Sequence, residues 1–183
     1  APFIILNADK IVMRFSANEW IQQSLELTKI ASSSMSLQQH VILAGFGRTG
    51  QNIATLLEEE QIPYRALDMD LERVRKADTA GANVSYADAT RRESLVAAGI
   101  HRASSLIITF ASVNAALRVL HYAKELAPSL PVIVRSYDDS DFDRLKAAGA
   151  DEVVPEVIES SLVLTSYAFM SYGVPMKRII KRV

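Results

Sequence analysis

The chain of 183 residues is long enough for one ordinary domain with short additions. Hydrophobic residues make up 49% of it and charged residues 22%, which is the composition of a globular protein with a real core. The net charge of −1 disfavours a nucleic-acid partner that binds through bulk charge. The chain has no cysteine, which excludes disulfides, thiolate nucleophiles and cysteine-ligated metals and is typical of a reducing compartment.

Residues 1–39 differ in pattern from the rest of the chain. A short apolar stub, residues 2–6, precedes residues 18–31, whose spacing of Ile and Leu predicts a helix. The serine-rich residues 32–36 indicate a flexible linker. We therefore expect residues 1–39 to be a stub and linker that lead into a folded domain beginning near His40.

From His40 onward, apolar runs alternate with helical patterns. Strands are expected at residues 41–45, 64–68, 84–87, 106–110, 132–135 and 152–154. The helices between them are expected at residues 49–60, 71–80, 92–98, 113–126 and 141–148, and three of these end at Gly81, Gly99 and Gly149. Uninterrupted apolar runs are typical of parallel strands buried on both faces. The pattern predicts the α/β class, with a Rossmann-like, doubly wound parallel sheet of six strands in residues 40–155.

One further helix is expected at residues 156–172, where Gly173 and Pro175 end it. Its apolar side chains cover more of its surface than the edge of a single Rossmann unit needs. A basic stretch, residues 177–183, follows it. Residues 156–183 are therefore expected to be a separate helical segment with a basic tail.

A glycine-rich loop joins the first strand to the first helix of this domain, with the spacing G-x-G-x-x-G. Its first glycine permits a tight turn, its second lets the backbone approach a pyrophosphate, and its third lets helix and strand pack closely. Free N–H groups at the start of the helix then face the anion. Arg48 either reaches a phosphate or is a solvated surface side chain. The predicted contacts from this loop are Gly45, Phe46, Gly47, Arg48, Thr49 and Gly50.

Asp68 ends the second strand at the distance from the glycine loop that ribose recognition requires. A carboxylate there accepts the ribose hydroxyls and repels a 2′-phosphate, which favours NAD or AMP over NADP. The neighbouring Met69 belongs to the same predicted site. Asp70 is better placed than Asp68 to cap the next helix. Arg73, one turn further on, either flanks the nucleotide or is solvated, and we expect it to be solvated.

Polar residues also follow the other strands, at the edge where ligands bind in open parallel sheets. Asp88, followed by Ala89, either accepts from the adenine amino group or caps the next helix. Arg135 indicates either a buried pair or a phosphate contact, and Glu156 indicates a partner for the last helix dipole. Asn114 either reaches the ligand or caps its own helix.

The sequence shows no set of catalytic residues. The histidines, His40, His101 and His121, lack metal-ligand spacing, and no serine lies in a nucleophile elbow. A dehydrogenase also needs a substrate domain and a general acid or base near the nicotinamide. We therefore predict no metal, no catalytic residue and no enzyme activity. A small NAD-dependent oxidoreductase and a ligand-free dimerisation scaffold remain as alternatives.

Several segments together resemble a known family. In order, they are HVILAGFGRTGQNIATLLEEE, ALDMD, YADATRRESLVAAG, LIITFASVNAAL, VIVRSYD and ADEVVPEVIESSL. Over residues 38–172 they resemble the RCK domain, also called KTN or TrkA-N, and most of all the C-terminal domain of Kef-type potassium/proton antiporters. One departure is Ala87, where the family often has glycine, so that the adenine end of the site is expected to differ.

The resemblance implies a cytosolic regulatory domain of a bacterial antiporter for potassium or another monovalent cation. AMP or NAD(H) would be the regulatory ligand, and its occupancy would gate transport by changing the geometry of a homodimer. The helix at residues 156–172 would form the dimer contact. Residues 1–15 would leave the transmembrane antiporter domain of the same polypeptide at the cytoplasmic face of the inner membrane. The family's charged positions near the site or dimer contact match Arg135 and Glu156.

Overall fold

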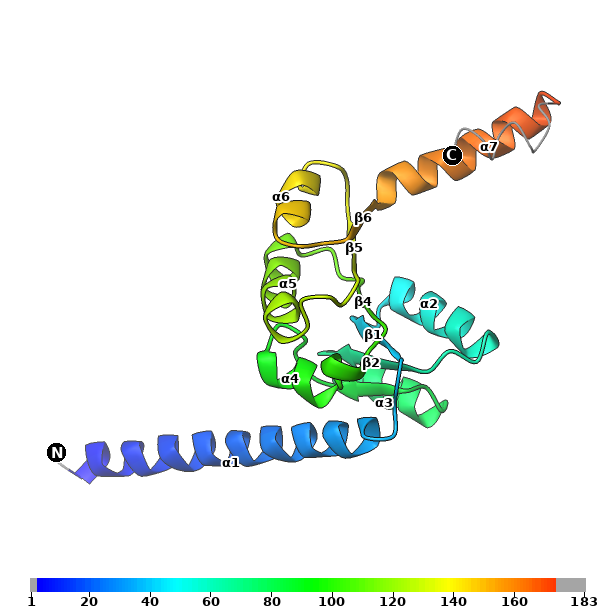
Figure 1. The fold of residues 1–183 in the computed structure, drawn as a ribbon. Helices are drawn as coiled ribbons and strands as arrows, with labels where there is room; N and C mark the ends of the chain where they lie inside the picture. The colour runs from blue at the N-terminus through cyan, green and yellow to red at the C-terminus, as the bar shows by residue number, and fades with distance from the viewer. Residues whose placement is uncertain (1–2, 174–183) are drawn as a thin grey trace.

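The structure, a computed structural model, describes residues 3–173 and contains one six-stranded sheet with helices on both faces (Figure 1). The expected basic tail at residues 177–183 lies outside the described residues. The strands are β1 (Val41–Ala44), β2 (Tyr64–Asp68), β3 (Val84–Tyr86), β4 (Ser105–Ile108), β5 (Val132–Ser136) and β6 (Glu152–Pro155). The helices are α1 (Phe3–Ser34), α2 (Arg48–Glu59), α3 (Leu71–Thr79), α4 (Arg92–Ala97), the 3₁₀ helix η1 (Ile100–Arg102), α5 (Val113–Leu126), α6 (Phe142–Ala147) and α7 (Glu156–Ser171).

All strands of the sheet run parallel, in the order β3-β2-β1-β4-β5-β6. This order confirms the predicted doubly wound Rossmann-like fold. The central strand β1 pairs with β2 on one side and β4 on the other, so that Val41 lies opposite both Tyr64 and Ser105. The chain changes direction across the sheet between β1 and β4. Open parallel sheets bind ligands at this switch point, outside the carboxyl ends of the strands.

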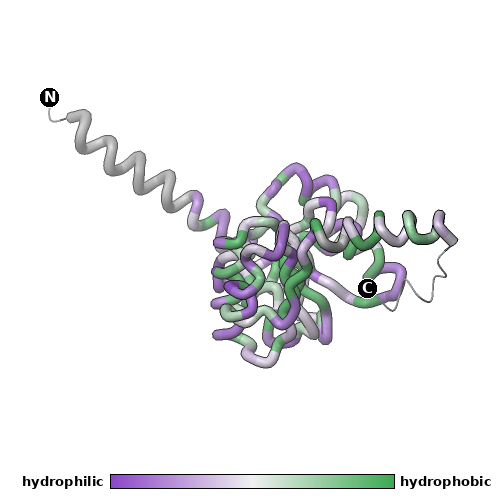
Figure 2. The backbone as a smooth tube through the Cα atoms, turned by 90° about the horizontal axis from the view of Figure 1, so that it is seen from above, coloured by the Kyte–Doolittle hydropathy of each residue, from purple (hydrophilic) through white to green (hydrophobic). Residues whose placement is uncertain are grey.

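Alternating side chains of β1 divide the core into two layers. Ile42 and Ala44 face α4 and α5, whereas Val41 and Leu43 face α2 and α3. Figure 1 shows these two pairs of helices on opposite sides of the sheet, and Figure 2 shows hydrophobic segments in the interior of the domain. Burial of the apolar surface on both faces is the main force that holds the sheet and its helices together. It therefore keeps the strand ends in fixed relative positions.

The predicted flexible linker at residues 32–36 is wrong for most of its length, because α1 continues to Ser34. The hydroxyls of Ser32 and Ser33 donate to carbonyls three residues earlier in the helix. Arg65 donates to the Ser33 carbonyl oxygen at 3.2 Å, and Arg102 donates to that of Ser34 at 2.9 Å. Two cations at its carboxyl end stabilise the helix through its dipole and fix it to the domain.

The last helix, α7, leaves the sheet after β6 and projects away from the domain (Figures 1 and 2). Several of its apolar side chains are exposed: Val157, Val163, Leu164, Tyr167 and Met170. Among residues 3–173, no helix combines the length and the apolar character that are needed to cross a membrane.

Candidate functional site

A cleft of about 760 Å³ lies at the carboxyl ends of the central strands, at the switch point of the sheet. The loops after β1, β2, β3 and β4, Arg135 of β5, and the starts of α2 and α7 contribute to its wall. The structure brings nine of the eleven predicted contacts to this wall: Gly45, Gly47, Arg48, Thr49, Asp68, Met69, Asp88, Ala89 and Arg135. The other two lie beneath it. Phe46 is buried against α2 and α3, and Gly50 packs on the loop itself.

The glycine loop has the geometry that its spacing predicts. Gly45 has φ +104°, and a Cβ there would lie 2.5 Å from Oγ1 of Thr109. A Cβ at Gly50 would lie 2.3 Å from the carbonyl oxygen of Gly45, so the third glycine permits the close contact of α2 with β1. Gly47 differs from both, because, apart from its own residue and its chain neighbours, no atom of the described chain lies within 4 Å of a Cβ placed there. Its backbone therefore faces open space in the cleft.

The N-terminus of α2 is directed at the same cleft. Gly47 is the N-cap residue, and no side chain in the described part of the chain caps the helix. The first N–H groups of a helix have no partner within the helix, and together with the helix dipole they form a site for anions. Arg48 and Thr49, the first two helical residues, lie on the wall of the cleft. This end of the cleft is therefore suited to a phosphate group.

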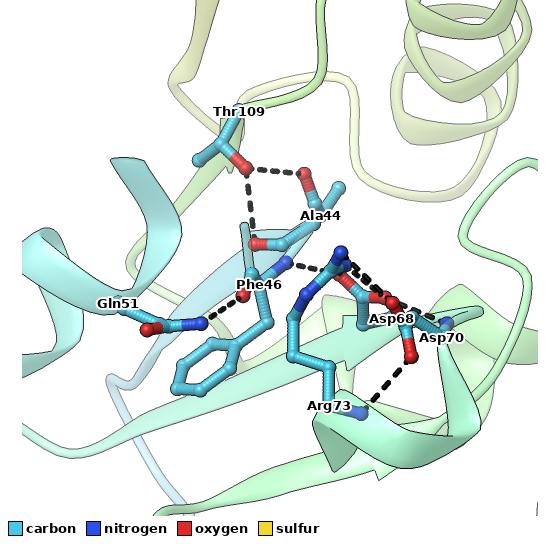
Figure 3. Close-up of polar contacts among 8 residues, drawn as sticks. Ala44, Phe46, Gln51, Asp68, Asp70, Arg73 and Thr109 are labelled. Atoms are coloured by element: carbon cyan, nitrogen blue, oxygen red, sulfur yellow. Dashed lines mark hydrogen bonds and ion pairs between the residues drawn. The ribbon is translucent and has the colours of Figure 1, made fainter. Parts of the chain in front are cut away.

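At the opposite edge of the glycine loop, Asp68 ends β2 with a buried carboxylate (Figure 3). Its Oδ2 accepts from the backbone N–H of Phe46 at 2.6 Å, and its Oδ1 accepts from that of Asp70 at 2.8 Å. Nη1 of Arg73 donates to both oxygens, at 2.8 and 2.9 Å. The expectation that Arg73 is a solvated side chain is therefore wrong. The helical spacing alone did not show that its side chain turns back to β2.

Asp70 caps α3 as predicted, because its carboxylate accepts from the backbone N–H of Arg73 at 3.0 Å. The same carboxylate pairs with Nη2 of Arg73 at 2.9 Å. Asp88 does not cap the next helix, since α4 begins at Arg92 without a side-chain cap. Its Oδ1 accepts instead from the N–H and the hydroxyl of Thr90 in a local turn.

Arg135 forms an ion pair with Glu156, but this is not the buried pair that was one of the two alternatives for the arginine, because both side chains are partly exposed. The other guanidinium nitrogen of Arg135 donates to the carbonyl oxygen of Thr109 at 3.0 Å. The pair therefore joins the ends of β4 and β5 to the first residue of α7, at the wall of the cleft.

Sequence reasoning missed two polar residues that follow β4. Thr109 holds the glycine loop against β4, because its hydroxyl donates to the carbonyl oxygens of Ala44 and Gly45. Ser112 caps α5, whereas Asn114 does neither of the things expected of it and accepts from Arg144. The position of Thr109 and Ser112 just after a central strand was the signal that pointed to them.

The histidines do not contribute to this cleft. His40 is buried at the far end of β1, where its Nε2 lies 2.8 Å from the carbonyl oxygen of Ala98. Burial lowers the pKa of His40 below its usual value, and the neighbouring Arg102 and Arg65 act in the same direction. Among the described residues, no group of three His, Cys, Asp or Glu side chains is arranged to hold a metal ion.

The fold, the glycine loop and the cleft at the switch point define a nucleotide-binding domain of the Rossmann type. Residues 41–156 match the TrkA-N domain family. The chain therefore belongs to this family, as the resemblance in its sequence predicted.

Known relatives place this domain within larger proteins. The chain is 43% identical, over 91% of its length, to a putative K(+) efflux antiporter KefB of Alkalimonas amylolytica. It spans only 25% of that relative's length. Its fold is similar to the Kef CTD of Shewanella denitrificans in its AMP-bound form, with a TM-score of 0.66, 26% identity, and 78% of this chain and 86% of that one covered. It is also similar in fold to the GsuK channel bound to NAD, with a TM-score of 0.63, 18% identity, and 73% and 23% covered.

Proposed function

We propose that this chain is a nucleotide-binding regulatory domain and that AMP or NAD(H) binds in the cleft. The uncapped N-terminus of α2 beside the open space at Gly47 is the observation that carries this proposal. Phosphate would lie against these N–H groups, and the ribose would lie near Asp68 at the end of β2. The adenine would then lie toward Asp88 and Ala89, which follow β3. A solved relative, the Kef CTD, is described in an AMP-bound form.

The larger protein would be a potassium/proton antiporter. The chain spans about a quarter of the first relative, which is named as a K(+) efflux antiporter. We infer that the rest of the polypeptide includes the transmembrane antiporter domain. The organisms of the two Kef relatives support a bacterial protein, with this domain at the cytoplasmic face of the inner membrane.

A homodimer would transmit the information whether a nucleotide is bound in the cleft. The exposed apolar side chains of α7 are the surface that we propose for the contact with a second copy. Glu156 begins this helix and lies on the wall of the cleft, so a bound nucleotide and the direction of α7 would influence each other. The ligand would act by binding one dimer geometry more tightly than another, with no bond chemistry.

Calorimetry of the purified 183-residue chain against AMP, NAD, NADH and NADP tests the nucleotide site. The decisive variant is Gly47→Ala, because the new methyl group meets no protein atom but projects into the cleft. We expect at least a tenfold loss of AMP affinity, about 1.4 kcal/mol, with an unchanged thermal unfolding midpoint. Thr55→Ala, on the same helix but away from the cleft, is the matched control and should bind like the unaltered chain.

Two results would contradict the proposal. Absence of binding by the unaltered chain at millimolar nucleotide would favour a ligand-free dimerisation scaffold. Undiminished affinity in Gly47→Ala would place the nucleotide elsewhere. Oxidation of NADH by the chain in the presence of simple carbonyl compounds would instead favour a small oxidoreductase.

A further inference from the structure

The carboxylate of Asp68 has no free acceptor position. An ionised carboxylate offers about four lone-pair sites on its two oxygens. The backbone N–H groups of Phe46 and Asp70 take one site on each oxygen, and Nη1 of Arg73 takes a second site on each. Figure 3 shows the arginine side chain reaching over the aspartate from α3. The two backbone donors lie in the loops that shape the cleft, so they stay in place as long as the domain is folded. The other two contacts come from the single side chain of Arg73, which can move without a change in the backbone.

A ribose ring needs the positions that Arg73 holds. Its 2′ and 3′ hydroxyls donate to a carboxylate at the end of the second strand, in the usual mode of the Rossmann fold. Asp68 has room for these two donors only if Arg73 leaves, since the backbone contacts are part of the fold. The arginine is thus an internal competitor of the ribose. The Arg73 side chain is 36% exposed, so it can turn away from Asp68 toward solvent without disturbing the core.

We propose that Arg73 determines the selectivity of this site at the ribose 2′ position. The inference rests on the proposed function, because it presumes that an adenine nucleotide enters the cleft. Arg73 lowers the affinity for nucleotides with a free 2′ hydroxyl by competing with them for Asp68. It raises the affinity for nucleotides with a 2′-phosphate, because its guanidinium is an anion-binding group that offsets the charge of Asp68.

Asp70 gives the displaced arginine a second position. Its Oδ2 already lies 2.9 Å from Nη2 of Arg73. A rotation of the guanidinium onto Asp70 therefore frees both oxygens of Asp68 while the arginine keeps a charged partner. In that position it remains at the edge of the ribose site, where a 2′ substituent would project. The arginine between the two acids would thus set the preference of the site between a free 2′ hydroxyl and a 2′-phosphate.

The experiment compares AMP with adenosine 2′,5′-bisphosphate, which differs only in its 2′-phosphate. Binding of both probes to the 183-residue chain, to Arg73→Ala and to Arg73→Gln is measured by calorimetry. Arg75→Ala removes the same type of side chain from the same helix, outside the cleft, and is the control. Thermal unfolding and circular dichroism establish that each variant is folded, and Arg73→Gln keeps most of the side chain in case the alanine variant is not.

We expect Arg73→Ala to bind AMP about threefold to tenfold more tightly, since a charge-assisted contact no longer competes with the ribose. Its affinity for the bisphosphate should fall, and Arg75→Ala should change neither. If the ratio of the two affinities is the same in Arg73→Ala as in the unaltered chain, or if both probes lose affinity equally, Arg73 does not determine the selectivity. Binding of AMP by the unaltered chain would still support the nucleotide site in that case. Failure of the unaltered chain to bind either probe would overturn both proposals.

Discussion

Arg135, at the end of β5, pairs with Glu156, the first residue of α7, across the wall of the cleft. The same guanidinium donates to the carbonyl oxygen of Thr109 after β4. One side chain therefore joins two strand ends to the helix that projects from the domain. The side chains are 23% and 46% exposed, so solvent screens the pair and its contribution to stability is modest. The pair holds the first residue of α7 beside the ends of β4 and β5.

Arg135→Met should loosen the start of α7 without unfolding the sheet. The methionine keeps the bulk of the side chain, but Glu156 and the Thr109 carbonyl lose their donor. We expect faster hydrogen exchange in the first turn of α7 and a loss of about 1 kcal/mol in the free energy of unfolding. Arg92→Met is the matched control, because it breaks an exposed pair with Glu125 elsewhere. Equal exchange in α7 for both variants would show that the pair does not hold the helix.

Gly50→Ala should destabilise the fold, in contrast to the stable Gly47→Ala. Its Cβ would lie 2.3 Å from the carbonyl oxygen of Gly45, which is backbone and has little room to move. We expect a loss of about 2 kcal/mol or more in the free energy of unfolding, measured with urea. A variant as stable as the unaltered chain would mean that α2 does not pack on β1 as closely as the structure shows.

The sequence predicted the centre of the sheet well because β1 and β2 are buried along their whole length. The apolar run of β1 is of the kind that a strand between two helical layers must have, whereas the edge strands β3 and β6 are shorter and partly exposed. The helix over residues 113–126 has the predicted bounds, and Asp70 caps α3 as predicted. These features depend on neighbours in the chain, which a sequence displays directly.

Contacts between distant segments were harder to predict. The serines at the end of α1 are typical of a flexible linker, but the guanidinium groups of Arg65 and Arg102, distant in sequence, donate to the carbonyls there. Likewise, the contact of Arg73 with Asp68 depends on how α3 lies against β2. A helical pattern gives the face on which a residue lies but not the rotamer that it adopts.

Arg102→Met should release the carboxyl end of α1. The arginine donates to the carbonyl oxygens of Ser34 and Leu37, and the methionine cannot. Trp20, the single tryptophan of the chain, lies on α1 and is exposed, so its fluorescence reports on this helix alone. We expect a lower fluorescence anisotropy and a loss of about 1–2 kcal/mol in stability. Arg118→Met, at an exposed position of α5, should leave the anisotropy unchanged.

Leu164→Lys should weaken the proposed dimer. Leu164 is 70% exposed on α7, and a lysine there would place a charge on an apolar contact with the second copy. Sedimentation velocity should show a shift toward monomer by at least about tenfold in the dissociation constant. Thr165→Lys adds the same charge at the next exposed position and should have a smaller effect. If both variants sediment like the unaltered chain, α7 is not the dimer contact.

His40 should make the stability of the domain depend on pH. In the neutral ring, Nε2 carries the proton that it donates to the Ala98 carbonyl oxygen, and the buried Nδ1 has no partner among the described residues. Burial therefore lowers the pKa of His40 from 6.5, and Arg102 and Arg65 add to this effect. Below pH 6.5 the imidazole of His40 binds a proton in the unfolded chain, whereas in the folded chain it stays neutral until the pH approaches its lowered pKa. The neutral histidine therefore contributes fully to the free energy of unfolding above that pH. This contribution is lost as the pH falls toward the pKa of His40 in the folded chain.

The thermal unfolding midpoint at pH 7.5, 6.5 and 5.5 measures this loss. Each pH unit within the window removes at most about 1.4 kcal/mol, which lowers the midpoint by about 2–6 °C. His40→Gln keeps a donor for the Ala98 carbonyl but does not titrate, so its midpoint should fall less over the same range. His101→Gln replaces an exposed histidine and should follow the unaltered chain. An equal fall in all three proteins would assign the pH dependence to other groups, because only the His40 variant removes the buried imidazole.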